Sequence, residues 1–231
     1  MSDSTSHDGT RKIGRGVFLT TVAGGLTSLW WGRTAWSHIS NAISPVESLV
    51  PLVPNGGWRI YTVSGTLPRF DSQTWRLEVG GAVRHPTSLG YDELRALPKA
   101  EQVSTFHCVT GWVVKNVAWG GVRVRDVLDH AAPRPDAHAI RFVSAEHPYD
   151  DYLTLEQAAL ADVLLAYEMD GKPLSRAHGA PLRLVIPEMY GYKNVKWLRR
   201  IELVPHAGSG YWEELGYDRD AWVGRSNGYG A

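Results

Sequence analysis

Cysteine is nearly absent from this chain, which has only Cys108 among its 231 residues. An internal disulfide is therefore excluded, and Cys108 is the one thiolate available as a nucleophile or as a ligand for a soft metal. Most free cysteines are buried small hydrophobes, and that interpretation stays open for a lone one. The neighbours of Cys108 favour a functional interpretation, because the alternating run from Val103 to Val109 ends at Thr110-Gly111. The cysteine thus lies near the end of an expected strand, where a scaffold can present it to a cleft.

An excess of charge is also lacking, since 24 basic residues balance 24 acidic ones. This balance argues against nucleic acid as a partner. The sequence contains no G-x-G-x-x-G, P-loop or H-E-x-x-H motif, and its nine histidines show no pair at zinc-ligand spacing. A hydrolase that pairs Cys108 with a distant base such as His147, His178 or His206 remains an alternative, because such partners need not be adjacent in sequence.

Long uncharged runs are scarce, and the one near the N-terminus lies between Arg15 and Arg33 after several basic residues. This order is typical of an export signal or a weak membrane anchor. The start of the run is similar to a twin-arginine export signal whose second arginine is replaced by Gly16. We expect residues 1–45 to be an export signal or anchor plus linker, and residues 46–231 to be the folded domain. The domain is then periplasmic or on the outer face of the cytoplasmic membrane; the alternative is a surface helix of a cytoplasmic protein.

Ten tryptophans, 24 glycines and 13 prolines indicate many strands and turns and little long helix. Besides the strand before Cys108, period-two and apolar runs predict strands at Trp58–Val63, Thr74–Val79, Ile140–Ser144, Val163–Tyr167, Leu182–Ile186 and Lys196–Val204. Short helices are expected at Tyr91–Leu97, Val122–Ala132, Thr154–Leu160 and Tyr211–Leu215, and a turn at Gly120-Gly121. This irregular interleaving predicts a mixed, strand-rich α+β fold rather than a doubly wound one.

The run from Thr105 to Trp112, Thr-Phe-His-Cys-Val-Thr-Gly-Trp, resembles the molybdenum-binding strand of the sulfite oxidase family. It is most similar to the bacterial branch that includes the periplasmic methionine-sulfoxide reductase catalytic subunit. The resemblance continues in order through Trp119–Val122, Tyr167–Leu174, His178–Pro187 and Tyr190–Leu198. It covers Trp58 to Glu214 and implies a sulfite-oxidase-type molybdopterin-binding fold.

The resemblance implies a Mo-molybdopterin cofactor with Cys108 as the protein ligand of the metal and a catalytic residue. Trp112 is the second expected catalytic residue, at the mouth of the site. Arg183 and Lys196 are expected to bind the phosphate of the cofactor, Arg183 through its planar fork and Lys196 as a point charge. The remaining expected cofactor contacts are Tyr61, Thr62, Ser144, His178, Asn194 and Val195.

The sequence departs from sulfite oxidases after the cysteine, because Val109–Trp112 supplies none of the arginines that receive an anionic substrate there. A mouth lined by Trp112 and Trp119 favours reduction of a neutral sulfoxide or N-oxide, on a small molecule or a protein. Sulfite oxidation is the first alternative, and a membrane-tethered binding module without catalysis is the second.

Two further expectations concern partners. About thirty residues follow Ile201, too few for the second domain through which sulfite oxidases dimerise, so a monomer is expected. No haem signature is present, so electrons are expected to pass to or from a separate partner such as a membrane redox protein.

Overall fold

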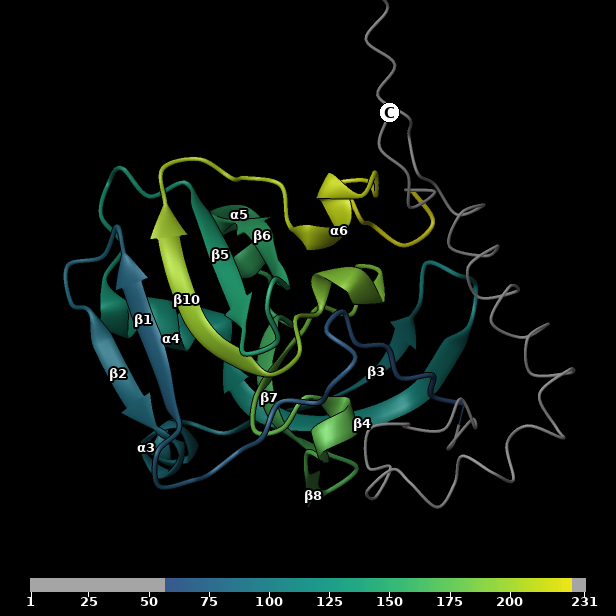
Figure 1. The fold of residues 1–231 in the computed structure, drawn as a ribbon. Helices are drawn as coiled ribbons and strands as arrows, with labels where there is room; N and C mark the ends of the chain where they lie inside the picture. The colour runs from purple at the N-terminus through teal and green to yellow at the C-terminus, as the bar shows by residue number, and fades with distance from the viewer. Residues whose placement is uncertain (1–56, 226–231) are drawn as a thin grey trace, which may run out of the picture.

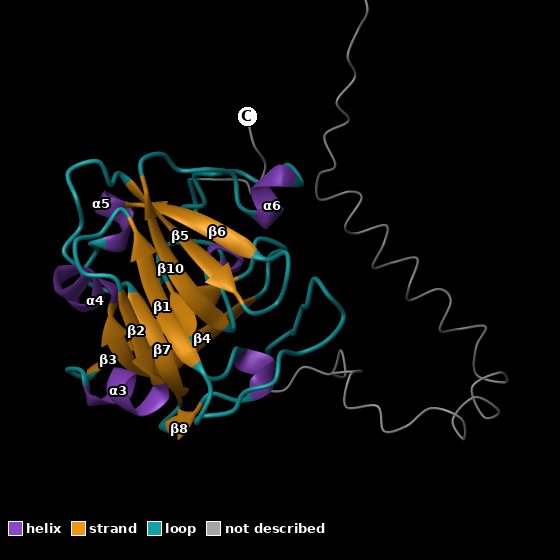
Figure 2. Cartoon of the chain, turned by 60° about the vertical axis from the view of Figure 1, so that its left-hand side comes forward, coloured by secondary structure: helices purple, strands orange, loops and turns teal. Residues whose placement is uncertain are grey.

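The computed structural model describes residues 57–225, which form a strand-rich mixed fold with two five-stranded sheets. The first sheet has the order β2 (Thr87–Gly90), β1 (Arg76–Gly81), β10 (Leu198–Val204), β5 (Ala139–Ser144) and β6 (Asp150–Thr154). The second has the order β3 (Ala100–His107), β4 (Val113–Arg123), β7 (Leu164–Met169) and β8 (Lys172–Pro173), with β9 (Arg183–Val185) also paired to β7. Short helices lie around the strands (Figures 1 and 2).

Only one pair of named strands, β1 with β10, is parallel, and the other pairs are antiparallel. In strand β1 the side chains alternate between the two faces: Leu77 and Val79 are buried, whereas Arg76 and Glu78, which alternate with them, are exposed. The mostly antiparallel pairing confirms the prediction of a mixed fold that is not doubly wound.

The helices are short and begin at or next to the predicted residues, with one exception. The helix predicted from Val122 begins at Val124, because Val122 and Arg123 belong to β4. The helices are α3 (Tyr91–Ala96), α4 (Val124–Ala131), α5 (Leu155–Ala158) and α6 (Tyr211–Glu214), with 3-10 turns η1 (Arg176–His178) and η2 (Gly191–Lys193). Helix α5 opens with a capping box, in which the Thr154 hydroxyl accepts from the Gln157 amide at 3.1 Å and the Gln157 side chain accepts from the Thr154 amide at 2.9 Å. Helix α4 buries one stripe at helical spacing, made of Val124, Val127, Leu128 and Ala131.

The turn predicted at Gly120-Gly121 is wrong, because β4 runs through both glycines. The register between β4 and β7 shifts at this point. A side chain on Gly121 would collide with the Leu165 carbonyl oxygen of β7. The paired glycines therefore allow two backbones to approach closely within a sheet instead of reversing the chain.

The strand predicted at Trp58–Val63 is also wrong, because residues 59–63 join no sheet. Side chains hold this backbone instead. Lys196 Nζ donates to the Tyr61 carbonyl at 2.7 Å, and the Glu146 carboxylate accepts from the amides of Val63 at 2.7 Å and Ser64 at 3.1 Å. We call residues 58–64 the strap; Figure 1 shows this purple-blue end of the described chain crossing from the β3–β4 side toward β1.

The predicted export signal or anchor, residues 1–45, lies outside the described residues, as does the domain boundary after it. Within residues 57–225, no helix is long and apolar enough to cross a membrane.

Candidate cofactor-binding site

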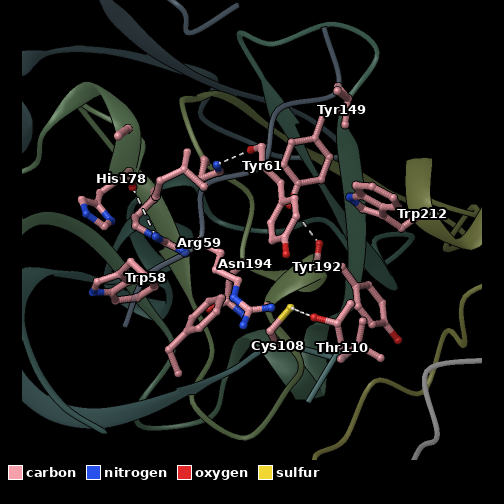
Figure 3. A pocket seen from close by; sticks show the side chains of 18 of the residues that line it. Trp58, Arg59, Tyr61, Cys108, Thr110, Tyr149, His178, Tyr192, Asn194 and Trp212 are labelled. Atoms are coloured by element: carbon pink, nitrogen blue, oxygen red, sulfur yellow. Dashed lines mark hydrogen bonds between the residues drawn. The ribbon is translucent and has the colours of Figure 1, made fainter. Parts of the chain in front are cut away.

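A pocket of about 790 Å³, counting its open mouth, lies where the strap, the Cys108 loop and several strand-end loops meet (Figure 3). Most of its lining is apolar or aromatic, which is the usual character of a ligand site. Seven residues predicted for the site line it together: Tyr61, Cys108, Trp112, His178, Arg183, Asn194 and Lys196.

Cys108 follows the last residue of β3 and begins a tight loop that returns to β4. The Cys108 amide donates to the Trp112 carbonyl at 2.9 Å, and the Gly111 amide donates to the Cys108 carbonyl at 3.0 Å. Gly111 has a φ of 96°, a left-handed conformation that favours glycine at this turn. The Thr110 hydroxyl oxygen lies 3.2 Å from the Cys108 sulfur, as Figure 3 shows.

The environment of the Cys108 sulfur contains opposing influences. Burial raises the pKa of the thiol, while hydrogen bonding from Thr110, the charge of Arg59 and the Trp112 indole lower it. The Trp112 Nε1 atom is itself buried and makes no regular hydrogen bond with any described group. Arg59 extends from the strap toward Cys108. The sulfur is thus a shielded site with donors and a cation around it.

Arg183, on β9, is a buried cation that is 2% exposed. Its guanidinium stacks over Trp119 at 5.1 Å and Phe106 at 5.8 Å, and donates to the His178 carbonyl at 3.2 Å. Burial lowers the pKa of Arg183 to about 10. Trp119 is 2% exposed and lies beneath Arg183, so it does not form the mouth that the sequence predicted.

Lys196 is the second cation of the pocket, and its ammonium is buried although part of the side chain faces the opening. Burial and, to a smaller extent, the charge of Arg183 lower its pKa to about 7, against a smaller opposite effect of Glu146. Among residues 57–225, the ion pairs do not include Arg183 or Lys196. Two buried cations without a carboxylate are costly in isolation, so this corner of the pocket fits an anionic group.

His178 ends η1 beside these cations. Its pKa is lowered to about 4, first by burial and then by Arg183 and Lys196, so the imidazole is neutral near pH 7. Its Nδ1 atom is buried without a hydrogen-bond partner among the described groups. The next residue, Gly179, has a φ of 105°, and a Cβ there would lie 3.0 Å from the Lys196 Cβ and 3.2 Å from that of Arg183. This glycine lets η1 pack closely against both cations.

Three residues predicted for the site, Thr62, Ser144 and Val195, are not in the pocket lining. Ser144 acts from behind the wall: its hydroxyl donates to the Lys196 carbonyl at 2.8 Å and accepts from the Glu146 amide at 2.9 Å. Val195 is fully buried, and its carbonyl accepts from the Leu184 amide at 2.8 Å.

Sequence reasoning missed several lining residues, namely Trp58, Arg59, Glu146, Tyr149, Tyr192, Trp212 and Tyr217. Glu146 and Tyr149 follow the end of β5, and position after a strand was the one signal that pointed toward them. Arg59 is 49 residues before Cys108, so no local pattern connects the two.

Comparison with known proteins identifies the family of this chain. A family model described as an oxidoreductase molybdopterin binding domain matches residues 64–212. The chain belongs to this family. Molybdopterin-dependent oxidoreductases are its homologues, its cofactor is Mo-molybdopterin, and the predicted resemblance is confirmed.

Three relatives show the range of this family. The uncharacterized oxidoreductase YuiH of Bacillus subtilis is 33% identical over 84% of this chain and 96% of its own length. Sulfite oxidase of Arabidopsis thaliana is 32% identical over 66% of this chain and 48% of its own. The protein-methionine-sulfoxide reductase catalytic subunit MsrP of Campylobacter jejuni is 28% identical over 62% and 54%. The chain thus matches nearly all of YuiH but only about half of the other two.

A solved structure supports the fold assignment. The sulfane dehydrogenase SoxCD from Paracoccus pantotrophus matches with a TM-score of 0.58 at 23% identity, over 62% of this chain and 41% of that one. At this identity the match shows a shared fold.

Proposed function

We propose that this chain is a molybdenum enzyme of oxo transfer in which Cys108 is the protein ligand of the metal. The observation that carries this proposal is the placement of the only cysteine in one pocket with two buried cations that lack carboxylate partners. The bound cofactor supplies the oxo-transfer chemistry, and the protein binds it, orients it and excludes water.

The residues of the pocket fit such a cofactor by their chemistry. Arg183 and Lys196 would bind its phosphate, because an anion there compensates both buried charges. The unpaired Nδ1 of neutral His178 would hydrogen-bond a polar group of the pterin. The side-chain oxygen of Asn194 already accepts a hydrogen bond from the Ile186 amide at 2.7 Å. Asn194 would therefore mainly shape the pocket wall.

For the substrate, we propose a sulfoxide or N-oxide, small or carried by a protein. The support is the aromatic wall around Cys108, to which Trp112, Tyr192 and Trp212 contribute. Such a wall offers apolar contact to a neutral group without requiring an ion pair.

Sulfite oxidation is a second candidate, and Arg59 favours it. The sequence argument against sulfite was the lack of positive charge after Cys108, but the Arg59 guanidinium supplies a cation beside the sulfur from the strap. Arg59 is exposed and has a route to an incoming anion.

The first experiment measures molybdenum per chain in protein from a host that makes the cofactor, for the parent and for Cys108→Ser. We expect near-stoichiometric metal in the parent, and a folded Cys108→Ser protein with an altered absorption spectrum and no activity. A well-folded parent without metal contradicts the proposal and supports a binding module instead.

The second experiment compares sulfite oxidation with sulfoxide reduction in the parent and in Arg59→Gln. If the substrate is a neutral sulfoxide, the substitution changes KM less than about threefold. If it is sulfite, loss of the cation that Arg59 places beside Cys108 raises KM by roughly tenfold or more, which corresponds to about 1.4 kcal/mol. Arg200→Gln, on β10, is the matched control, because Arg200 is also exposed but does not line the pocket.

We further propose export to the outer face of the cytoplasmic membrane and exchange of electrons with a separate membrane redox partner. Both rest on the basic and then uncharged run that ends at Arg33. Fractionation of cells that express the full chain tests the location.

A further inference from the structure

The loop that carries Cys108 is closed by its backbone alone. Two hydrogen bonds, from the Cys108 amide to the Trp112 carbonyl and from the Gly111 amide to the Cys108 carbonyl, together with the left-handed Gly111, define its shape. The Thr110 side chain takes part in neither bond. Its hydroxyl is nevertheless directed at the Cys108 sulfur, 3.2 Å away.

The direction of that hydrogen bond follows from the protonation state of the sulfur. A cysteine that binds a metal does so as a thiolate, which has lone pairs but no proton to donate. The Thr110 hydroxyl is then the donor and the Cys108 sulfur the acceptor. The second candidate donor is the buried Nε1 of Trp112, which has no regular partner among the described groups and acts on the same sulfur.

We propose that Thr110 is a positioning residue that sets the reduction potential of the metal bound by Cys108, through a hydrogen bond from its hydroxyl to the cysteine sulfur. This inference rests on the proposed function, because it needs Cys108 as a metal ligand. A donor withdraws electron density from a ligand sulfur, and that stabilises the more electron-rich, reduced state of the metal. Thr110 therefore raises the potential, and its loss lowers it.

The test uses two substitutions that separate the hydroxyl from the shape of the side chain. Thr110→Val keeps the branched shape and removes the donor, whereas Thr110→Ser keeps the donor and removes a methyl group. Both are purified with the cofactor and compared with the parent by molybdenum content, midpoint potential and absorption spectrum. Thr87→Val, at the start of β2 in the other sheet, controls for the exchange of threonine for valine.

We expect Thr110→Val to bind molybdenum like the parent but to shift the reduction equilibrium three- to tenfold toward the oxidised state. For a one-electron couple this is a drop of about 30 to 60 mV. Thr110→Ser and Thr87→Val should keep the parental potential.

A loaded Thr110→Val protein with the parental potential and spectrum would overturn the inference while leaving the proposed function intact. A potential that falls equally in Thr110→Ser would also overturn it, because the methyl group and not the hydroxyl would then matter. A parent without molybdenum would instead overturn the proposed function, and the inference with it.

Discussion

The arginine and lysine side chains inside the pocket have different partners from a partly exposed arginine outside it. Arg141, in the first sheet, pairs with Asp150 at 2.5 Å and with Glu202 at 3.3 Å. Arg183 and Lys196, which are more deeply buried, have only carbonyl oxygens and aromatic faces as partners within the described chain. Carbonyl oxygens do not neutralise a positive charge. The charges of Arg183 and Lys196 therefore stay uncompensated until an anionic ligand binds beside them.

The first prediction concerns the cost of this arrangement in the cofactor-free protein. The pKa of Lys196 is about 7 in the folded chain and 10.5 at its ordinary value. Between these pH values the unfolded chain binds more protons, so the free energy of unfolding rises with pH, and below pH 7 the folded protein bears the full cost. From pH 7 to 9 we expect Lys196 to contribute a gain of about 2 kcal/mol.

Urea unfolding of the cofactor-free parent and of Lys196→Met at pH 7, 8 and 9 measures this gain. The methionine variant should be more stable than the parent at pH 7 and should show a flatter dependence on pH. If the free energy of unfolding changed with pH in the same way in both proteins, the prediction that burial destabilises the Lys196 ammonium would be contradicted.

Within the second sheet, β4 and β7 depend on a glycine contact. Gly121 lies where their register shifts, and a Cβ there would meet the Leu165 carbonyl oxygen and the Ala166 Cα. Backbone atoms cannot turn aside as a flexible side chain can, so a side chain at this position would push the two strands apart.

The second prediction follows from this contact. Gly121→Ala should lower the free energy of unfolding by about 1 to 3 kcal/mol or more. Gly80→Ala is the matched control, since Gly80 is also a strand glycine but a Cβ there would meet nothing within 4 Å. Equal unfolding midpoints in urea for the two variants would show that β4 and β7 separate at little cost.

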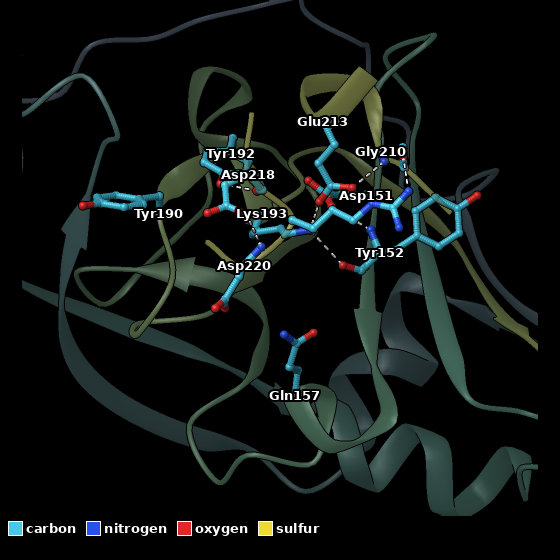
Figure 4. A network of polar contacts seen from close by, with 12 residues as sticks. Asp151, Tyr152, Gln157, Tyr190, Tyr192, Lys193, Gly210, Glu213, Asp218 and Asp220 are labelled. Atoms are coloured by element: carbon cyan, nitrogen blue, oxygen red, sulfur yellow. Dashed lines mark hydrogen bonds and ion pairs between the residues drawn. The ribbon is translucent and has the colours of Figure 1, made fainter. Parts of the chain in front are cut away.

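At the scale of the whole molecule, one buried ion cluster connects two walls of the pocket, η2 and α6, to strand β6, as the polar contacts in Figure 4 show. Lys193 Nζ contacts Asp151 at 2.7 Å, the Tyr152 carbonyl at 3.1 Å and the Glu213 carboxylate. The sequence neighbours of these residues line the pocket: Tyr192 and Asn194 beside Lys193, and Trp212 beside Glu213. The cluster therefore joins β6, η2 and α6 at one ammonium group.

The third prediction is that Lys193→Met lowers the free energy of unfolding by about 3 to 5 kcal/mol at pH 8, because it leaves two buried carboxylates without a cation. Burial raises the pKa of Asp151 to about 7. At pH 5 the Asp151 carboxyl is then protonated and no longer repels Glu213, so the loss should be smaller there. Lys172→Met, on exposed β8, is the control for urea unfolding. A loss as small as that of the control would mean that the cluster does not hold the walls together.

Local patterns determined much of this molecule before any tertiary structure was considered. Alternating apolar residues predicted β1, apolar residues at helical spacing predicted α4, and the capping box of Thr154 and Gln157 predicted the start of α5. Each signal depends only on residues that are close together in the chain. The ordered motifs around Cys108 indicated the family and seven of the pocket-lining residues.

Only the tertiary structure showed the irregular path of the strap, the register shift at Gly121 and the position of the Arg59 cation beside Cys108. The strap looks like a strand in sequence, but its hydrogen bonds come from Lys196 and Glu146, far along the chain. Arg59 meets Cys108 across 49 residues of sequence. The sequence of a segment shows its periodicity. It does not show which distant segments the fold brings next to it, and these determine the partners of its polar groups and the charge around a sulfur.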